Sequence, residues 1–355
     1  LLAVAINPSC GMFGVGRNCS LTTRSVLVNI PRIVLTGGPC AGKTTAQADM
    51  REWLLEREYY PIFVPEAATS LMRAGLSPLR PEFQPAVLQH VLLHEAMLEN
   101  AAKRLQDEGK KPVLIADRGV CDQLAYAGMD QMQTLLREHD LRFEQVRDER
   151  YDGVIYMRSA ANGAEQFYTA ASNETRYETL EEAKLLDDRT MHAWVGTPHL
   201  IVIKNEPDEP FSGKINRAVG ALARILGEPE PLEAERKFLV SDFILSQLPS
   251  HAVPCDIVQT YLVGVPGKTE RVRARGQNNY WVYSHTIKEY VADGVAIERE
   301  RILSRAEYDN FLIRRDNRRV DIHKIRHCFV YDGHYCELDV SILVVGWVKS
   351  TSRLK

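Results

Sequence analysis

Short apolar runs alternate with longer helical segments between residues 31 and 225. The runs lie in "PRIVLTG", "YPIFVPEAA", "KPVLIADRG", "DGVIYMR" and "HLIVIKN". A chain that alternates strand and helix in this order is typical of a parallel sheet with helices on both faces. Ligands of such sheets bind where the strands end, so polar residues that follow these runs are candidates for function.

A different pattern follows the Pro- and Glu-rich segment "LGEPEPLEAE", which marks a domain boundary near residue 229. Charged residues recur at every second position, and side chains two apart in a strand share one face. One such strand would be a solvated edge, but six in about 110 residues predict an antiparallel sheet closed around a polar interior. The charged positions are Glu233, Glu235, Lys237, Arg271, Arg273, Arg275, Lys288, Glu298, Glu300, Lys324, Arg326, Glu337 and Asp339.

The segment "GGPCAGKT" matches GxxxxGK[ST] between a predicted strand and a predicted helix. Glycines let successive backbone amides face phosphate oxygens, and the helix N-terminus adds its positive dipole. Lys43 would reach the terminal phosphates, and the Thr44 hydroxyl would ligate Mg²⁺. The predicted nucleotide-binding residues are Gly37, Gly38, Pro39, Cys40, Ala41, Gly42, Lys43, Thr44 and Thr45.

Four further residues are candidates for chemistry at this site. Asp117 would hold Mg²⁺ directly or through water, although a helix N-cap also favours Asp. Arg118 would contact phosphate, and Glu66 would be the general base for a substrate hydroxyl unless it is only a helix cap. Arg176 lies in a charged stretch that is either a solvated helix face or a mobile lid whose arginine meets the phosphoryl group.

The motifs "GGPCAGKT", "VPEAA" and "ADRG" resemble the AAA-type P-loop module that is related to nicotinamide-riboside and nucleotide kinases. The resemblance covers about residues 31 to 225 and implies binding of GTP or ATP with Mg²⁺. There is no NKxD sequence for guanine, so the base is not predicted.

The second half has its own chemical logic. Opposed carboxylates would hold Mg²⁺ or Mn²⁺, and Arg and Lys would hold a polyanion such as a triphosphate. The charge pattern resembles the CYTH, or triphosphate-tunnel, family. The resemblance implies metal binding by Glu233, Glu235, Glu298, Glu300, Glu337 and Asp339, and polyphosphate binding by Lys237, Arg271, Arg273, Lys288, Lys324 and Arg326. That family closes with a strand that carries two glutamates, whereas this chain ends "VSILVVGWVKSTSRLK"; the difference favours binding over hydrolysis.

The predicted fold is therefore an α/β P-loop domain over residues 31–228, followed by an antiparallel β-barrel over 229–340, with an unassigned segment 1–30 and a divergent tail 341–355. Composition is that of a globular protein, and a net charge of −3 does not favour a nucleic-acid partner. Seven scattered cysteines without CxxC favour a reducing, cytoplasmic location. The first thirty residues faintly resemble a mitochondrial transit peptide, but a fragment or a misplaced start is the favoured interpretation.

The combination of the two modules resembles GTP- and phosphoinositide-binding proteins of membrane trafficking, which implies peripheral membrane association. The first hypothesis is a regulatory nucleotide-binding protein whose tunnel binds phosphoinositide or another polyphosphate. The second is a P-loop kinase of a small hydroxyl substrate, fused to a metal-dependent triphosphatase. The third is a protein that binds a nucleotide only for stability.

Overall fold

The computed structural model describes residues 2–6, 30–168, 179–228, 232–234, 236–240, 245–264, 267–292 and 295–341, with the backbone alone described at 2–6, 232–234, 236–240, 292 and 295. The chain divides into two compact units. One, the α/β unit, contains Asn7–Leu232 and Val330–Tyr335. The other, the antiparallel unit, contains Leu1–Ile6, Glu233–Phe329 and Cys336–Lys355.

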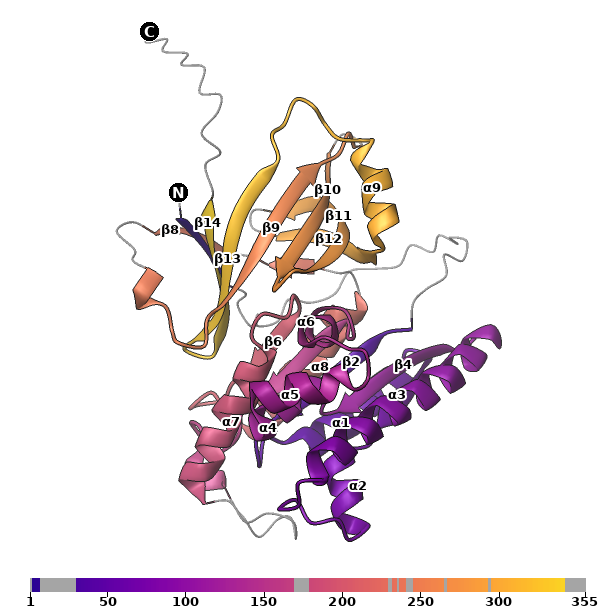
Figure 1. Ribbon diagram of the computed structural model, residues 1–355, viewed down its shortest axis with the longest axis vertical. Helices are drawn as coiled ribbons and strands as arrows, with labels where there is room; N and C mark the ends of the chain where they lie inside the picture. Colours follow the sequence, from indigo (N-terminus) through magenta and orange to yellow (C-terminus); the bar gives the residue numbers. More distant parts are fainter. Residues whose placement is uncertain are drawn as a thin grey trace. The chain divides into compact units, whose positions relative to one another are not determined.

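The α/β unit is built on a five-stranded parallel sheet (Figure 1). Its strands are β2 Arg32–Gly37, β3 Tyr59–Val64, β4 Lys111–Asp117, β5 Gly153–Met157 and β6 Leu200–Ile203. They lie in the order β3-β4-β2-β5-β6, which places β2 in the centre. All four pairs of neighbours run parallel, as the alternation of apolar runs and helices predicts.

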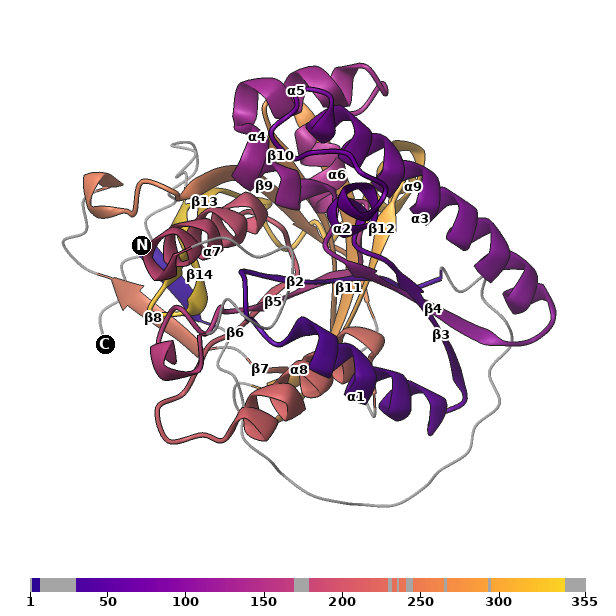
Figure 2. The ribbon, with the colours of Figure 1, turned by 90° about the horizontal axis from the view of Figure 1, so that it is seen from below.

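Helices cover both faces of this sheet (Figure 2). The helices are α1 Lys43–Leu55, α2 Ala67–Arg73, α3 Phe83–Asp107, α4 Leu124–Ala127, α5 Met129–Arg137, α6 Phe143–Asp148, α7 Leu180–Trp194 and α8 Phe211–Leu226, with 3₁₀ turns η1 Val120–Gln123 and η2 Glu165–Phe167. Helices α1 and α8 pack together on one face, and α3 and α7 lie on the other.

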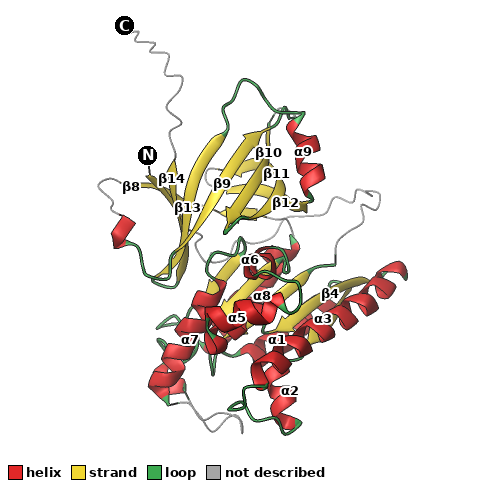
Figure 3. Cartoon of the chain, in the orientation of Figure 1, coloured by secondary structure: helices red, strands yellow, loops and turns green. Residues whose placement is uncertain are grey.

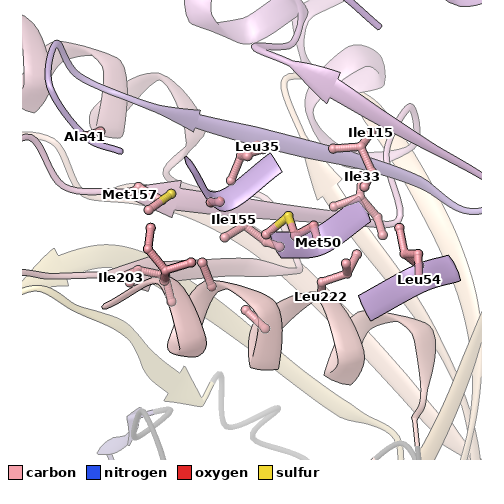
Figure 4. Packing of buried hydrophobic residues seen from close by; sticks show 14 of the residues in the cluster. Ile33, Leu35, Ala41, Met50, Leu54, Ile115, Ile155, Met157, Ile203 and Leu222 are labelled. Carbon is pink, nitrogen blue, oxygen red and sulfur yellow. The ribbon is translucent and has the colours of Figure 1, made fainter. Parts of the chain in front are cut away.

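Alternation along the buried strands decides which helix each side chain contacts. Ile33, Leu35 and Ile115 face α1 and α8 and form the main core with Met50 and Leu222, among others (Figure 4). The intervening residues of β4, Leu114 and Ala116, face the other way and pack with Ala102 of α3. Both faces of the strands are therefore apolar, which explains why they read as continuous hydrophobic runs.

The antiparallel unit is a nine-stranded sheet (Figure 3). Its elements are β1 Leu2–Ile6, β7 Leu232–Ala234, β8 Arg236–Val240, the turn η4 Leu245–Gln247, β9 Val253–Tyr261, β10 Lys268–Gln277, β11 Tyr280–Ala292, β12 Val295–Leu303, α9 Arg305–Leu312, β13 Ile322–Tyr331 and β14 His334–Ser341. The order is β7-β12-β11-β10-β9-β13-β14-β1-β8. Helix α9 covers one face, where Tyr308 packs with Val272, Ala274 and Leu303.

The charge pattern predicts a single strand over Leu232–Val240. The structure instead has two strands there, β7 and β8, at opposite ends of the sheet. β7 is a neighbour of β12 and β8 pairs with β1, yet only residue 235 separates β7 from β8 in the chain. Two residues span at most about 7 Å, so the two ends of the sheet must approach each other. The sheet is accordingly curled, and β1 comes from the segment for which the sequence predicts no structure.

These features confirm a parallel α/β sheet followed by a curled antiparallel sheet; the identification of the latter with the tunnel family stays a prediction. Among the described residues, no helix combines the length and apolar character that crossing a bilayer requires.

Adjacent leucines of α1 give a matched test of the core. Leu54 is fully buried, whereas Leu55 is 56% exposed. We expect Leu54→Ala to lower the free energy of unfolding by about 2–5 kcal/mol, because a cavity opens between α1 and the sheet. Leu55→Ala should change it by less than about 0.5 kcal/mol. Urea denaturation followed by far-ultraviolet circular dichroism measures both; equal effects would contradict the packing of α1.

Candidate functional site

The loop between β2 and α1 has the backbone that a phosphate-binding loop requires. Gly37 ends β2, and a Cβ there would lie 2.1 Å from the carbonyl oxygen of Met157. Gly42 precedes the first residue of α1 and has φ 93°, and Cys40 has φ 56° although it is not glycine. Glycine adopts such angles without a Cβ clash. The residues predicted to bind phosphate therefore form a tight turn at the N-terminus of a helix, where backbone amides attract anions.

A buried carboxylate on α7 holds this loop in place. Asp187 is fully buried, and its carboxylate accepts hydrogen bonds from the backbone amides of Gly38 and Ser159, both at 3.0 Å. Further donors are the Tyr156 hydroxyl at 2.7 Å, the Asn162 amide at 2.7 Å and the Arg158 guanidinium at 3.2 Å. Sequence reasoning missed Asp187. The sequence feature that could have identified it is a charged residue on the apolar face of α7, four positions from each of the buried residues Ala183 and Met191.

The strand ends bring together the charged residues that the sequence predicts. The Lys43 ammonium lies 3.9 Å from Asp117, which ends β4. The Arg118 guanidinium donates to Glu66 at 2.6 Å. Arg118 also lies 3.8 Å from Asp122, which sequence reasoning missed and which is buried. Lys43, Glu66, Asp117, Arg118 and Asp122 thus form one cluster, called here the phosphate-side cluster.

Charges within the phosphate-side cluster perturb one another. Burial and the neighbouring Arg118 lower the pKa of Lys43, against the pull of nearby carboxylates. Burial alone would raise the pKa of Glu66, but Arg118 and then Lys43 outweigh it and lower this pKa to about 2. A bound anion would relieve the repulsion between Lys43 and Arg118, whereas the three carboxylates of the cluster would favour a cation such as Mg²⁺ beside it. Because its pKa is about 2, Glu66 is a weak proton acceptor near neutral pH.

The residues predicted to hold Mg²⁺ fit a hard cation. Oδ1 of Asp117 is buried and accepts no hydrogen bond from the described residues, so a cation would satisfy it. Thr44 is exposed in the first turn of α1, next to Lys43. Asp117 does not cap a helix, whereas Glu66 does occupy the N-cap position of α2 and also accepts a hydrogen bond from Thr69. Arg176 lies outside the described residues.

In the antiparallel unit, charged side chains meet across neighbouring strands. Arg271 and Lys288 contact Glu298 at 3.4 and 3.0 Å. Glu300 accepts a hydrogen bond from Thr286 at 2.8 Å and lies 3.8 Å from Arg273. The register pairs Thr286 with Arg271 on one side and with Glu300 on the other, so these residues share one face of β10, β11 and β12.

The hairpin of β13 and β14 continues the same arrangement. Asp339 accepts hydrogen bonds from Lys324 and, at 2.8 Å, from Nε of Arg326. Arg326 also pairs with Glu337. Burial and the neighbouring Arg326 lower the pKa of Lys324 to about 8. These side chains are at most about a fifth exposed, so this face of the hairpin, called here the enclosed face together with the charged face of β10, β11 and β12, is largely shielded from solvent.

Cations outnumber carboxylates on this enclosed face, as far as its side chains are described. Six cationic side chains accompany four carboxylates; they are Arg271, Arg273, Arg275, Lys288, Lys324 and Arg326, with Glu298, Glu300, Glu337 and Asp339. Nε of Arg271 and Nε of Arg273 are buried and find no acceptor among the described residues. Burial and the adjacent Arg271 lower the pKa of Arg273. An anion in the interior would relieve both features.

Metal binding by the second unit stays a prediction. Within the described ranges, no group of three or more His, Cys, Asp or Glu residues is arranged to hold a metal ion. Glu235 lies outside those ranges, and only the backbone is described for Glu233 and Lys237, so this absence does not extend to these three residues.

Glu66 should make stability depend on acid pH. Its pKa is about 2 in the folded chain and about 4.3 unfolded, so ionised Glu66, through Arg118, Lys43 and Thr69 together, stabilises the fold above about pH 5 by on the order of 3 kcal/mol, and this contribution is lost as the pH falls towards 2. We expect Glu66→Gln to destabilise the protein near neutral pH and to lose less stability than the wild type on acidification. Urea titrations over that range test this, with exposed Glu138→Gln as the control; parallel profiles would contradict it.

Comparison with known proteins agrees with the geometry of the first unit. A family model described as an AAA domain matches residues 32–209, which begin with β2 and end just before α8. A search of curated proteins found no match. The matched region contains the loop between β2 and α1, Asp187, which accepts a hydrogen bond from that loop, and the phosphate-side cluster. It covers half of the 355 residues, and the chain therefore belongs to the AAA domain family.

Proposed function

We propose that this protein is a regulatory nucleotide-binding protein that takes GTP or ATP with Mg²⁺ on its P-loop and a polyphosphate on its antiparallel unit. The observation that carries the proposal is the pairing of the loop geometry with the phosphate-side cluster. Lys43 and Arg118 are held near each other beside backbone amides at a helix N-terminus, and Lys43 has a lowered pKa. This arrangement suits a triphosphate.

In this site the loop amides bind phosphate oxygens and Lys43 neutralises the terminal phosphates. Thr44 and Asp117 would hold Mg²⁺, which supplies charge neutralisation between the phosphates. Glu66 orients the Arg118 guanidinium by the 2.6 Å hydrogen bond to Nε, and the Asp122 carboxylate lies 3.8 Å from another guanidinium nitrogen. Arg118 has φ 68°, a backbone angle that its surroundings must stabilise.

The state of Glu66 favours binding over phosphoryl transfer to a hydroxyl. A general base works best when its pKa lies near the operating pH. Glu66 has a pKa of about 2 and is engaged by both Arg118 and Thr69. These contacts support a positioning role for Glu66, in place of the catalytic role in the kinase hypothesis.

The antiparallel unit is proposed to bind phosphoinositide head groups or another polyphosphate. Among its described side chains, cations outnumber carboxylates on the enclosed face, and Nε of Arg271 and Nε of Arg273 are buried without an acceptor there. Arginines bind phosphate through paired charge-assisted hydrogen bonds. A lipid-borne head group would bring the protein to the surface of a membrane and connect nucleotide binding with trafficking.

Lys43→Ala should lower the affinity for GTP and ATP at least about a hundredfold, because the terminal phosphates lose a buried, hydrogen-bonding cation. Titration of labelled nucleotide with Mg²⁺ measures this, and phosphate release is followed in parallel. Lys103→Ala is the matched control, since Lys103 is 57% exposed on α3. Full affinity of the Lys43 variant would refute the P-loop proposal, and rapid turnover by the wild type would favour an enzyme.

The double variant Arg271→Ala/Arg273→Ala should bind inorganic triphosphate and soluble inositol polyphosphate at least about tenfold more weakly, because two charge-assisted contacts are lost. Calorimetric titration measures the loss. The exposed pair Arg318→Ala/Arg319→Ala is the control. Nucleotide affinity at the P-loop should stay unchanged in both variants. Undiminished polyphosphate affinity of the Arg271/Arg273 variant would show that the enclosed face is not the binding site.

A further inference from the structure

The residues described so far surround the phosphates of the proposed ligand, and the order of the strands indicates on which side its nucleoside part would lie. The phosphate-side cluster comes from the ends of β3 and β4, on one side of the central strand β2. Lys43 and Asp117 mark where the terminal phosphate and its metal would sit. The rest of the nucleotide must therefore extend to the other side of the loop, towards β5, β6 and the segment that follows them.

An exposed aromatic ring lies on that side. Phe211 is the first residue of α8, and 53% of its surface is exposed. Its ring packs against the phosphate-binding loop itself, because a Cβ on Gly42 would lie only 2.8 Å from the ring carbons Cε2 and Cζ. Gly42 directly precedes Lys43. The ring is thus in contact with the loop backbone while about half of the residue remains open.

Hydrogen bonds fix the segment between β6 and α8 that carries Phe211. Lys214 donates to the Arg158 carbonyl at 2.6 Å and to the Asn205 side chain at 2.8 Å. Arg217 donates to the Lys204 carbonyl at 2.7 Å and to the side chain of Glu209 at 2.6 Å. These bonds fasten both ends of residues 204–210 to α8. The backbone that leads into Phe211 is therefore held by hydrogen bonds that need no ligand.

We propose that Phe211 is the stacking platform for the nucleobase of the bound nucleoside triphosphate, an inference that rests on the proposed nucleotide binding. A planar aromatic ring offers its face to any base, and base–aromatic stacking needs no specific hydrogen-bond partner. Such a platform accounts for base binding in a chain without NKxD. Phe211 would thus stack on either purine, with little discrimination between guanine and adenine.

The experiment compares four substitutions at one position. Phe211→Ala should weaken GTP and ATP binding by roughly 5- to 150-fold, the range that loss of one base–aromatic contact gives. Phe211→Tyr should retain wild-type affinity, and Phe211→Leu, which is apolar but not aromatic, should lose most of it. In Phe211→Trp, a nucleotide should quench the added tryptophan fluorescence, relative to the wild type, whereas inorganic triphosphate should not.

The controls separate this inference from the proposed function. Affinity for inorganic triphosphate, which has no base, should be unchanged by Phe211→Ala when both proteins also carry Arg271→Ala/Arg273→Ala, so that binding at the P-loop is what is measured. If the wild type binds no nucleotide, both the proposed function and this inference fail. If the wild type binds nucleotide and Phe211→Ala or Phe211→Leu binds it equally well, only the stacking role is overturned. Thermal unfolding of the nucleotide-free variants shows whether each remains folded, and the tyrosine and tryptophan variants keep the test decisive where the alanine variant does not.

Discussion

The α/β unit depends on a carboxylate that is buried in its interior. Asp187 has no exposed surface, and an unpaired charge there would be prohibitively unfavourable. Donors from three parts of the chain satisfy it: Gly38 in the loop, then Tyr156, Arg158 and Ser159 around the end of β5, and Asn162 just beyond. The loop conformation and the placement of α7 are therefore a single constraint. A change in the loop would remove the Gly38 hydrogen bond, and a displacement of α7 would separate the buried anion from all of these donors.

The antiparallel unit meets the opposite problem, since it encloses charges of both signs. Cross-strand pairs such as Lys288–Glu298 and Arg326–Asp339 offset part of the desolvation cost. Compensation is incomplete for the side chains that are described, because cations outnumber carboxylates and two guanidinium nitrogens lack an acceptor there. A buried donor without a partner costs free energy that an anionic ligand would recover on binding. An interior of this kind is thus less stable empty than occupied.

Sequence patterns predicted the features that have a strict period or a strict spacing. Two-residue alternation located β10 to β14, and GxxxxGK[ST] located the loop and the start of α1. Long-range pairing was not predictable in the same way. β1 and the division of Leu232–Val240 into β7 and β8 depend on which strands become neighbours, and no local pattern encodes that. β9 and α9 also carry no charge signature and were not predicted.

The site residues, too, were predictable where a local sequence pattern marks them and not where a contact remote in sequence defines their role. Lys43, Glu66, Asp117 and Arg118 follow strands or lie in the motif, so the rule for strand ends found them. Asp187 acts from a helix that is remote in sequence, and its charge on an apolar helix face is the only local sign of its role.

The proposed function would bring two ways of binding phosphate into one chain, and the two differ physically. In the α/β unit most donors are backbone amides, fixed by the fold, with Lys43 and Arg118 as the added charges. In the antiparallel unit the donors are side chains that must exchange a carboxylate partner for the ligand. Direct exchange of ion pairs makes binding more sensitive to competing ions and to protonation, since the pKa of Lys324 is about 8. The affinity for the proposed polyphosphate should thus respond to salt and pH, whereas the proposed nucleotide site is formed by a backbone that the fold already fixes.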